Sequence, residues 1–247
     1  SASVWFSWRN ITASKNNNKF SIIHPTTAGN TTLNFTIPDG GYNLSDVNNF
    51  LRYSLISAGY YIQNNTTNEQ IVYAKFQVNP STYTCEFVSY PMPTSLPSGY
   101  TAGSAITFPT TTRAPQLTFT QVNFGTVIGF AVGTYPSVQQ TILTTTSSTT
   151  VPVVSDVTNV VLTLDSAMNP FAPNSKVIHS ISPAGYAYAS LIKSEPNEIS
   201  WVPQQSGWRQ SITLQLTNQE LVPLDQYDTD LTIKLLLRYR NPDLINR

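Results

Sequence analysis

Short β-rich runs, each closed by Pro, Gly, Asn or Ser, recur along almost the whole chain. Their spacing of roughly 8–15 residues leaves little room for crossover helices and is typical of antiparallel sandwiches and barrels. Ser211–Thr217 alternates polar and apolar side chains at every position, which predicts a half-buried strand. Leu231–Tyr239 is more continuously apolar, which predicts a strand buried more deeply. The sequence therefore predicts an all-β fold, a jelly-roll-type antiparallel sandwich.

The predicted strands combine β-branched and aromatic residues between turn formers. They are Val4–Trp8, Phe20–His24, Thr31–Ile37, Tyr60–Gln63, Ile71–Val78, Tyr83–Tyr90, Ala105–Phe108, Gln116–Gln121, Thr126–Gly133, Val157–Leu164, Lys176–Ile181, Glu198–Val202, Ser211–Thr217 and Asp230–Arg240. The turn Asn79-Pro80-Ser81 joins Ile71–Val78 to Tyr83–Tyr90 in a predicted hairpin.

One segment, at about 43–58, departs from the strand pattern. Its apolar residues recur at helical spacing: Val47, Phe50, Leu51 and Leu55. Ser45 precedes them as a predicted N-cap, and Gly59 follows as a stop signal. We expect one surface helix that packs this apolar stripe on a sheet.

The domain organisation has two solutions. The first is a single elaborated β domain over residues 1–247. The alternative divides the chain into residues 1–143 and 156–247, joined by the Ser/Thr-rich run at 144–150. The composition of that run favours a linker, whereas the strand-like segment Thr126–Gly133 argues for order in the residues before it.

Charged residues are scarce, at 11% of the chain, where an ordinary soluble domain has about 25%. The formal net charge of zero argues against a strongly basic surface, so we expect no sequence-specific nucleic-acid binding. Between Glu86 and Asp156 the only charged residue is Arg113. Because interface cores are depleted in Lys, Glu and Asp, we expect the principal protein contacts around this neutral stretch.

The residues that most often carry catalysis form no recognisable motif. His24 and His179 each lie in a predicted strand, and neither has a second histidine at metal-ligand spacing, so we expect packed or hydrogen-bonded side chains. Cys85 alternates with its neighbours in a predicted strand and is interpreted as a small core residue. No apolar run approaches the length of a transmembrane helix, so we expect no membrane span. We assign no catalytic, cofactor-binding or metal-binding residue.

An acidic cluster near the end of the chain leaves two interpretations open. Asp225, Asp228 and Asp230 could hold a hard cation such as Ca²⁺ through carboxylate oxygens. They lack the glycine and the distal glutamate of a calcium loop, which favours a plain loop between strands. Arg238 and Arg240 share one strand face by period-two geometry and are interpreted as structural ion-pair partners.

Two tryptophans flank a predicted exposed turn, Pro203–Gly207. Trp201 and Trp208 beside glutamines are compatible with a glycan-binding platform, although tryptophans that cover the end of a sandwich are commoner. A glycoside hydrolase is the weakest hypothesis, and its only formulation uses Glu195, Glu198 and Asp225.

Three stretches, taken in order, carry a resemblance to a known group of proteins. The first is Trp8–Thr12 followed by Asn16–Phe20, and the second is Phe35–Phe50 with its Ile37-Pro38-Asp39-Gly40-Gly41-Tyr42 motif. The last comprises Ser211–Glu220, Val222–Asp225 and Leu231–Arg238, and Gly129-Phe130 stands mid-chain. Together they resemble β-rich virion proteins of eukaryotic double-stranded DNA viruses, the polinton/adintovirus-like and giant-virus group. The resemblance implies a jelly-roll capsid component of the minor or penton type.

The motif around Pro38 also has a reading from its residues alone. Pro38 removes a backbone donor and so ends the preceding strand. Gly40 and Gly41 are expected to take positive φ and to turn the chain sharply into the helix. We interpret the motif as a structural corner.

The leading hypothesis is a non-enzymatic capsid protein that associates with itself and with other capsid proteins in a virion assembled inside the host cell. Its support is the low charge, the missing catalytic motif and the resemblance. The alternative is a receptor- or glycan-binding spike or fibre-head domain, motivated by Trp201 and Trp208.

Overall fold

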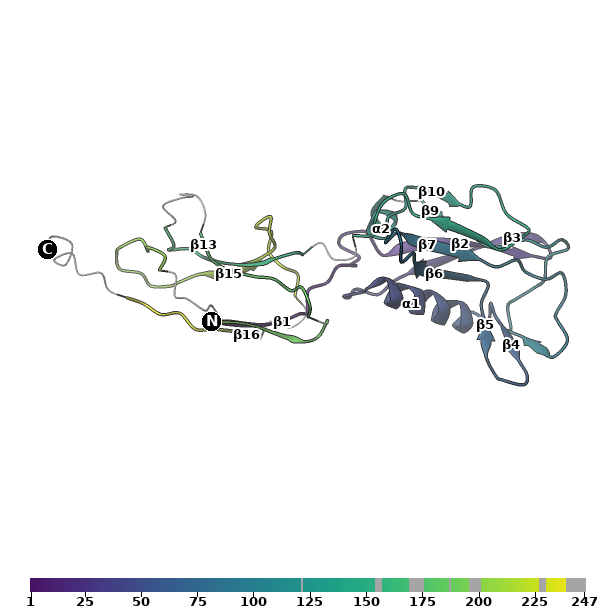
Figure 1. The fold of residues 1–247 in the computed structure, drawn as a ribbon, viewed down its shortest axis with the longest axis horizontal. Coiled ribbons are helices and arrows are strands. Elements are labelled where there is room, and N and C mark those ends of the chain that lie inside the picture. The colour runs from purple at the N-terminus through teal and green to yellow at the C-terminus, as the bar shows by residue number, and fades with distance from the viewer. Residues whose placement is uncertain are drawn as a thin grey trace. The chain divides into compact units, whose positions relative to one another are not determined.

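The computed structural model of the protein describes residues 1–120, 122–153, 157–168, 176–186, 188–195, 201–226 and 230–238 (Figure 1). The chain divides into two compact units. The larger unit is Arg9–Asp156, and the smaller unit combines Ser1–Trp8 with Val157–Arg247. The boundary falls close to the division that the sequence offers as its alternative, but the first eight residues belong to the C-terminal unit. Residues 198–200 of the expected strand Glu198–Val202 lie outside the described residues.

The predicted fold class is confirmed. Strands dominate the described residues, and every sheet is antiparallel. The expected helix is α1, Leu44–Ser57. The predicted hairpin is β6, Ala74–Val78, with β7, Cys85–Ser89, in which Val78 is opposite Cys85. No helix in the described parts of the chain is long and apolar enough to cross a membrane.

The larger unit contains three sheets (Figure 1). The four-stranded sheet has the order β10-β9-β2-β3, with bounds Gly133–Tyr135, Gln116–Phe119, Lys19–Thr26 and Gly29–Thr36. A three-stranded sheet has the order β11-β7-β6, in which β11 is Thr144–Ser147. The small third sheet has the order β5-β4-β8, with bounds Gln70–Ile71, Ile62–Asn64 and Tyr100–Ala102.

Phenylalanine rings fill the core of the larger unit. Phe20, Phe35 and Phe119 come from the four-stranded sheet, and Phe76 and Phe87 come from the sheet β11-β7-β6, so the two sheets face one another as a sandwich. Phe124 of α2, Val122–Val127, and Phe130 after it complete the core. Phe20 stacks on Phe35 with ring centroids 5.2 Å apart, and its ring also meets Phe76 of the other sheet edge-on at 6.0 Å. Aromatic pairs of this kind add to the stabilisation that burial provides.

Helix α1 closes one side of this sandwich. Its buried residues, Leu44, Val47, Leu51 and Leu55, pack into the same core. Asn48 of the helix accepts a hydrogen bond from the backbone N–H of Phe76 in β6 over 2.8 Å. The helix therefore satisfies a donor on an edge strand that would otherwise be open.

The N-cap of α1 differs from the prediction. Asn43, not Ser45, caps the helix: its side chain accepts from the Asp46 N–H over 2.9 Å, and the Asp46 carboxylate accepts from the Asn43 N–H over 2.9 Å. This reciprocal pair is a capping box. Ser45 lies inside the first turn, where its hydroxyl cannot reach the same donors.

The corner before α1 is held differently from the expectation. Neither Gly40 nor Gly41 is among the glycines with positive φ, so the predicted reason for these glycines is wrong. Gly40 instead pairs with the backbone of Ile11, and a Cβ atom there would lie 2.8 Å from the Tyr42 ring. Only glycine fits at position 40, because the Tyr42 ring occupies the space that a Cβ atom would need.

The Ser/Thr-rich run is not a linker. Thr144–Ser147 forms β11 and pairs with β7. Ser148 is buried, and its backbone N–H donates to the Cys85 carbonyl over 2.7 Å. The Gly129 carbonyl then accepts from the N–H groups of Thr149 and Thr150. The prediction failed because a run of Ser and Thr occurs both in flexible linkers and in strands at the edge of a sheet, so composition alone does not distinguish them.

The predicted strand Thr126–Gly133 is also wrong. Its first residues belong to a short helix, α2, Val122–Val127. Gly129, at φ +87°, follows in the left-handed region, and Ile128 and Phe130 are fully buried on either side of it. A short apolar run that is buried all round has no periodicity by which to tell helix from strand.

The described residues of the smaller unit form two three-stranded sheets. One has the order β14-β1-β16, with bounds Leu191–Ser194, Ala2–Trp5 and Leu231–Ile233. The other has the order β13-β12-β15, with bounds Val177–Ile181, Val160–Leu164 and Leu214–Thr217. Residues of both sheets meet in one core, which includes Ala2, Val4, Val160, Ile181 and Ile192.

The C-terminal strand is shorter and more exposed than its sequence predicts. The expected strand Asp230–Arg240 is paired only over Leu231–Ile233. Leu235, Leu236 and Leu237 follow it without a strand partner in the described residues and are 43%, 69% and 75% exposed. The prediction of deep burial is therefore wrong for these leucines.

Candidate functional site

The cysteine and the histidines are structural residues. Cys85 is fully buried, and burial, reinforced by the negative charge of Glu86, raises the pKa of its thiol to about 12. The thiol therefore stays protonated and is a core residue, as predicted. His24 is buried edge-on to the Tyr60 ring, with centroids 4.8 Å apart, and its Nδ1 is 3.0 Å from the Pro25 carbonyl. His179 Nε2 is 2.8 Å from the Ser194 hydroxyl.

Burial also sets the charge state of His24. It lowers the pKa of the imidazole to about 4, although the hydrogen bond to the Pro25 carbonyl opposes part of this shift. The pKa of His179 is lowered as well, chiefly by burial. Both rings are therefore neutral at physiological pH, which suits packing better than proton transfer.

The acidic candidates do not form a metal site in the residues described. Asp225 and Asp230 are described, whereas Asp228 lies outside the described residues. Within the described ranges no three His, Cys, Asp or Glu side chains gather closely enough to hold a metal ion. Glu195 and Asp230 line a shallow hollow on the sheet β14-β1-β16 together with Lys193 and Lys234. Glu198, which the hydrolase hypothesis needs, lies outside the described residues.

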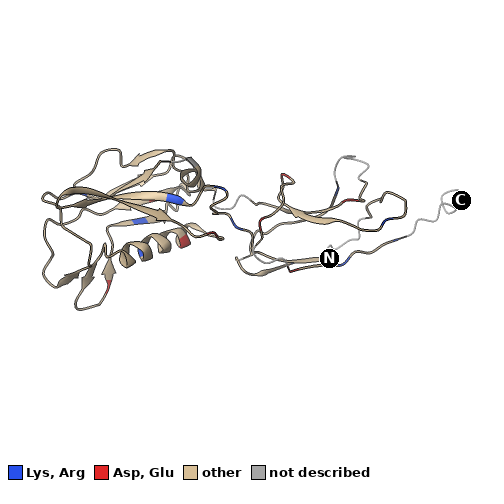
Figure 2. Cartoon of the chain, turned by 180° about the vertical axis from the view of Figure 1, so that it is seen from behind, with Lys and Arg blue, Asp and Glu red and all other residues tan. Residues whose placement is uncertain are grey.

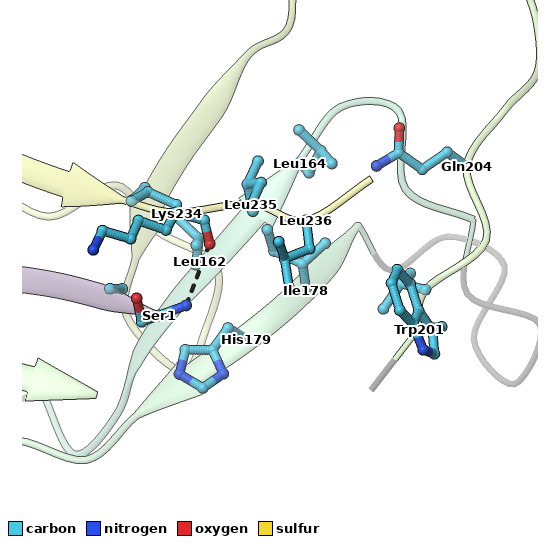
Figure 3. Close-up of a pocket in the computed structure, with 13 residues that line it drawn as sticks. Ser1, Leu162, Leu164, Ile178, His179, Trp201, Gln204, Lys234, Leu235 and Leu236 are labelled. Atoms are coloured by element: carbon cyan, nitrogen blue, oxygen red, sulfur yellow. Dashed lines mark hydrogen bonds between the residues drawn. The ribbon is translucent and has the colours of Figure 1, made fainter. Parts of the chain in front are cut away.

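The clearest candidate site is the open end of the smaller unit's sandwich (Figure 3). A hollow of about 340 Å³ lies between the two sheets there. Ile233 and Leu235 line it from the β16 side, and Leu162, Leu164 and Ile178 line it from the facing sheet. The lining is therefore mostly apolar, a character that binding sites for proteins and for small molecules share.

Trp201 completes the hollow and is half exposed. The guanidinium of Arg238 lies over its ring, 5.6 Å from the centroid. This cation–π contact is one that the sequence did not predict for Arg238, whose expected ion pair stays a prediction. Arg240 lies outside the described residues. Trp208 is 84% exposed, so the two tryptophans do not cover the sandwich end as a buried pair.

Three consecutive exposed leucines, Leu235, Leu236 and Leu237, follow β16 at this end of the smaller unit. We call them the leucine strip. Leu235 and Leu236 line the hollow, and the backbone pairing with β1 ends at Lys234 and Ser1. In Figure 3 Leu235 and Leu236 lie beside Ile178 and Leu164, across the open side of the sandwich. Sequence reasoning missed this strip as a surface because an apolar run predicts burial and does not reveal where its pairing partner ends.

The neutral stretch that the sequence singles out lies in the larger unit. It forms β7, β8, β9, α2, β10 and β11, and it leaves Val138, Ile142 and Leu143 exposed. Figure 2 shows lysines, arginines and acids as isolated spots on an otherwise uncharged chain. Within this unit, charged residues are therefore few and scattered along the chain.

Comparison with known proteins finds no matching family model, no matching curated protein and no matching solved structure. The functional argument consequently depends on the residues and their geometry.

Proposed function

We propose that the chain is a non-enzymatic structural component of a viral capsid, of the minor or penton type, which contacts further copies of itself and neighbouring capsid proteins in the virion. The observation that carries this proposal is the open apolar end of the smaller unit. Trp201, Leu235 and Leu236 line one hollow there and remain substantially exposed. Contiguous apolar surface of this kind marks interaction sites, because isolated soluble proteins rarely leave it in water.

The low charge supports the same function. The exposed side chains Val138, Ile142 and Leu143 belong to a stretch of the sequence whose only charged residue is Arg113, so few charges there would resist burial against a partner. A symmetric shell repeats one such surface many times, so each neutral contact stabilises the assembly once per copy. The buried, protonated Cys85 and the neutral histidines favour a structural role over a catalytic one.

The first test is association in solution. Light scattering over a concentration series should show oligomers of the full chain. The double variant Leu236→Ser/Leu237→Ser should shift this association to higher concentration. Tyr53→Ser, which removes a comparably exposed apolar side chain from α1, should leave it unchanged. The second test is imaging of particles in which the chain is labelled. A chain that stays monomeric at every concentration and never co-purifies with particles contradicts the proposal.

A glycan- or receptor-binding role is the second candidate, and one observation favours it. Trp208 presents 84% of its surface to solvent, which leaves an indole face open for stacking on a sugar ring. A glycan array probed with the full chain should give a signal that Trp208→Ala abolishes, while Tyr53→Ser retains it. An array without signal argues against this candidate and leaves the capsid proposal standing.

A further inference from the structure

The hydrogen bonds between Ser1 and Lys234 determine which way the backbone of β16 faces. The Lys234 N–H donates to the Ser1 carbonyl over 2.9 Å, and the Ser1 amine donates to the Lys234 carbonyl over 3.3 Å. Lys234 therefore directs both of its backbone groups toward β1. Because these directions alternate along an antiparallel strand, Leu231, Ile233 and Leu235 direct theirs to the opposite edge. The described residues contain no backbone partner for that outer edge of β16.

This open edge is unlike the edge strand β6 of the larger unit. There α1 lies along the strand, and Asn48 accepts the hydrogen bond that the Phe76 N–H offers. At β16 no described helix or side chain does the same, and the leucine strip continues the edge with apolar groups. An edge of this kind pairs with another strand when one of matching pattern is available.

We propose that β16 pairs antiparallel with β16 of a second copy of the chain, about a twofold axis at Ile233. The two sheets β14-β1-β16 then become one six-stranded sheet. The inference rests on the proposed function, since it specifies one of the self-contacts that the capsid role requires. Its interface is isologous, because the same segment is used by both copies.

The sequence of the segment selects this register. With the axis at Ile233, Leu231 is opposite Leu235 of the second copy, so apolar side chains meet along the core face. On the other face Thr232 is opposite Lys234 of the second copy, so Lys234 is not directly opposite another charge. Lys234 of one copy is diagonal both to Asp230 and to Lys234 of the other, so a contact between opposite charges accompanies one between like charges.

The two neighbouring registers are poorer. An axis at Lys234 places two lysines directly opposite each other, which is destabilising. An axis at Thr232 leaves Leu235 without an apolar partner in the second copy. Of these three registers, only the axis at Ile233 gives Leu235 an apolar partner without placing two lysines directly opposite each other.

Disulfide trapping distinguishes these registers. Thr232 and Lys234 are exposed on the outer face, so Thr232→Cys and Lys234→Cys should fold normally. In the proposed register each is opposite the other in a non-hydrogen-bonded pair, with Cα atoms about 4.5 Å apart, which suits a disulfide. A mixture of the two variants, oxidised with diamide, should give a cross-linked dimer, whereas each variant alone should give little. The wild-type chain is the control, since its single Cys85 is buried.

Each other result overturns a defined part of the proposal. A cross-link formed by Lys234→Cys alone or by Thr232→Cys alone refutes the Ile233 register. Association by light scattering without any cross-link places the contact elsewhere, so the strand pairing fails while the proposed function stands. Trapping to a different protein in purified particles also refutes the second copy as occupant. A chain that is monomeric throughout contradicts both proposals.

Discussion

The side-chain amide of Asn10 makes both hydrogen bonds that a neighbouring strand would make to Tyr42. Its Nδ2 donates to the Tyr42 carbonyl over 2.6 Å, and its Oδ1 accepts from the Tyr42 N–H over 2.9 Å. Next to this pair, Ile11 and Gly40 exchange backbone hydrogen bonds. Two of the segments that carry the family resemblance therefore hold one another in place, which gives their residues a structural explanation.

Replacing Asn10 should destabilise the larger unit. Asn10→Ala leaves the backbone groups of Tyr42 without these partners, at a cost of about 1–3 kcal/mol in the free energy of unfolding. Asn10→Asp removes the donor and brings a carboxylate toward the Tyr42 carbonyl, so it should be at least as harmful. Chemical denaturation followed by circular dichroism measures both effects. Asn49→Ala, at an exposed position of α1, is the control and should stay close to wild type.

The capping box of α1 predicts a difference between two adjacent polar residues. Asn43→Ala should lower the free energy of unfolding by about 1 kcal/mol, because the Asp46 N–H loses its acceptor. Ser45→Ala should change it by much less, since Ser45 does not cap the helix. Equal effects of the two substitutions in thermal or denaturant unfolding would contradict the assignment of Asn43.

His24 makes the stability of the larger unit depend on pH. Its pKa in the folded chain is about 4, against an ordinary value of 6.5, so the unfolded chain binds the proton first as pH falls. Stability is retained above the unfolded value and lost as the pH drops from 6.5 toward 4, with a loss of about 2 kcal/mol by pH 5. Denaturation midpoints measured across this range test the slope.

Two substitutions separate this contribution from other titrating groups. His24→Phe keeps an aromatic ring beside Tyr60 and removes the titrating group, so its midpoint should vary less with pH between 5 and 7. His179→Gln alters the half-buried histidine of the smaller unit and should retain the wild-type slope for the larger unit. A His24→Phe chain with an unchanged slope would show that another group is responsible.

The Cys85 thiol should be unreactive in the folded protein. Because burial raises its pKa to about 12, a thiol reagent at pH 8 should react only as fast as the larger unit opens. Denaturant should restore ordinary reactivity. Ser81→Cys, in the exposed turn of the same hairpin, should react at once and provides the calibration. Rapid labelling of the wild-type chain without denaturant would contradict this prediction.

The sequence located well those elements that neighbouring residues specify, through turn formers or through the spacing of apolar side chains. The hairpin β6–β7 has its turn residues at Asn79-Pro80-Ser81, and α1 has its apolar stripe from Val47 to Leu55. The Ser/Thr run at 144–150 failed because its order comes from distant partners, Cys85 and Gly129, that no local pattern encodes. The strand Thr126–Gly133 failed because complete burial erases periodicity.

The candidate site was harder to predict than the fold. The sequence identified Trp201 and Arg238 but not their contact with each other, and it interpreted the leucines beside them as buried. These leucines are exposed because the pairing of β16 with β1 ends before them. That end is determined by the register between two strands that lie more than two hundred residues apart in the sequence. Long-range pairing of this kind has no signature within a window of sequence.

The place of β1 within its sheet also determines when that sheet forms. β1 lies between β14 and β16, so its neighbours come from Leu191–Ser194 and Leu231–Ile233, late in the chain. During synthesis the last described strand of the larger unit is complete at Ser147, long before β16 is synthesised. Strand β1 must therefore wait without its sheet partners while the unit after it folds, and the smaller unit closes only after β16 has been synthesised.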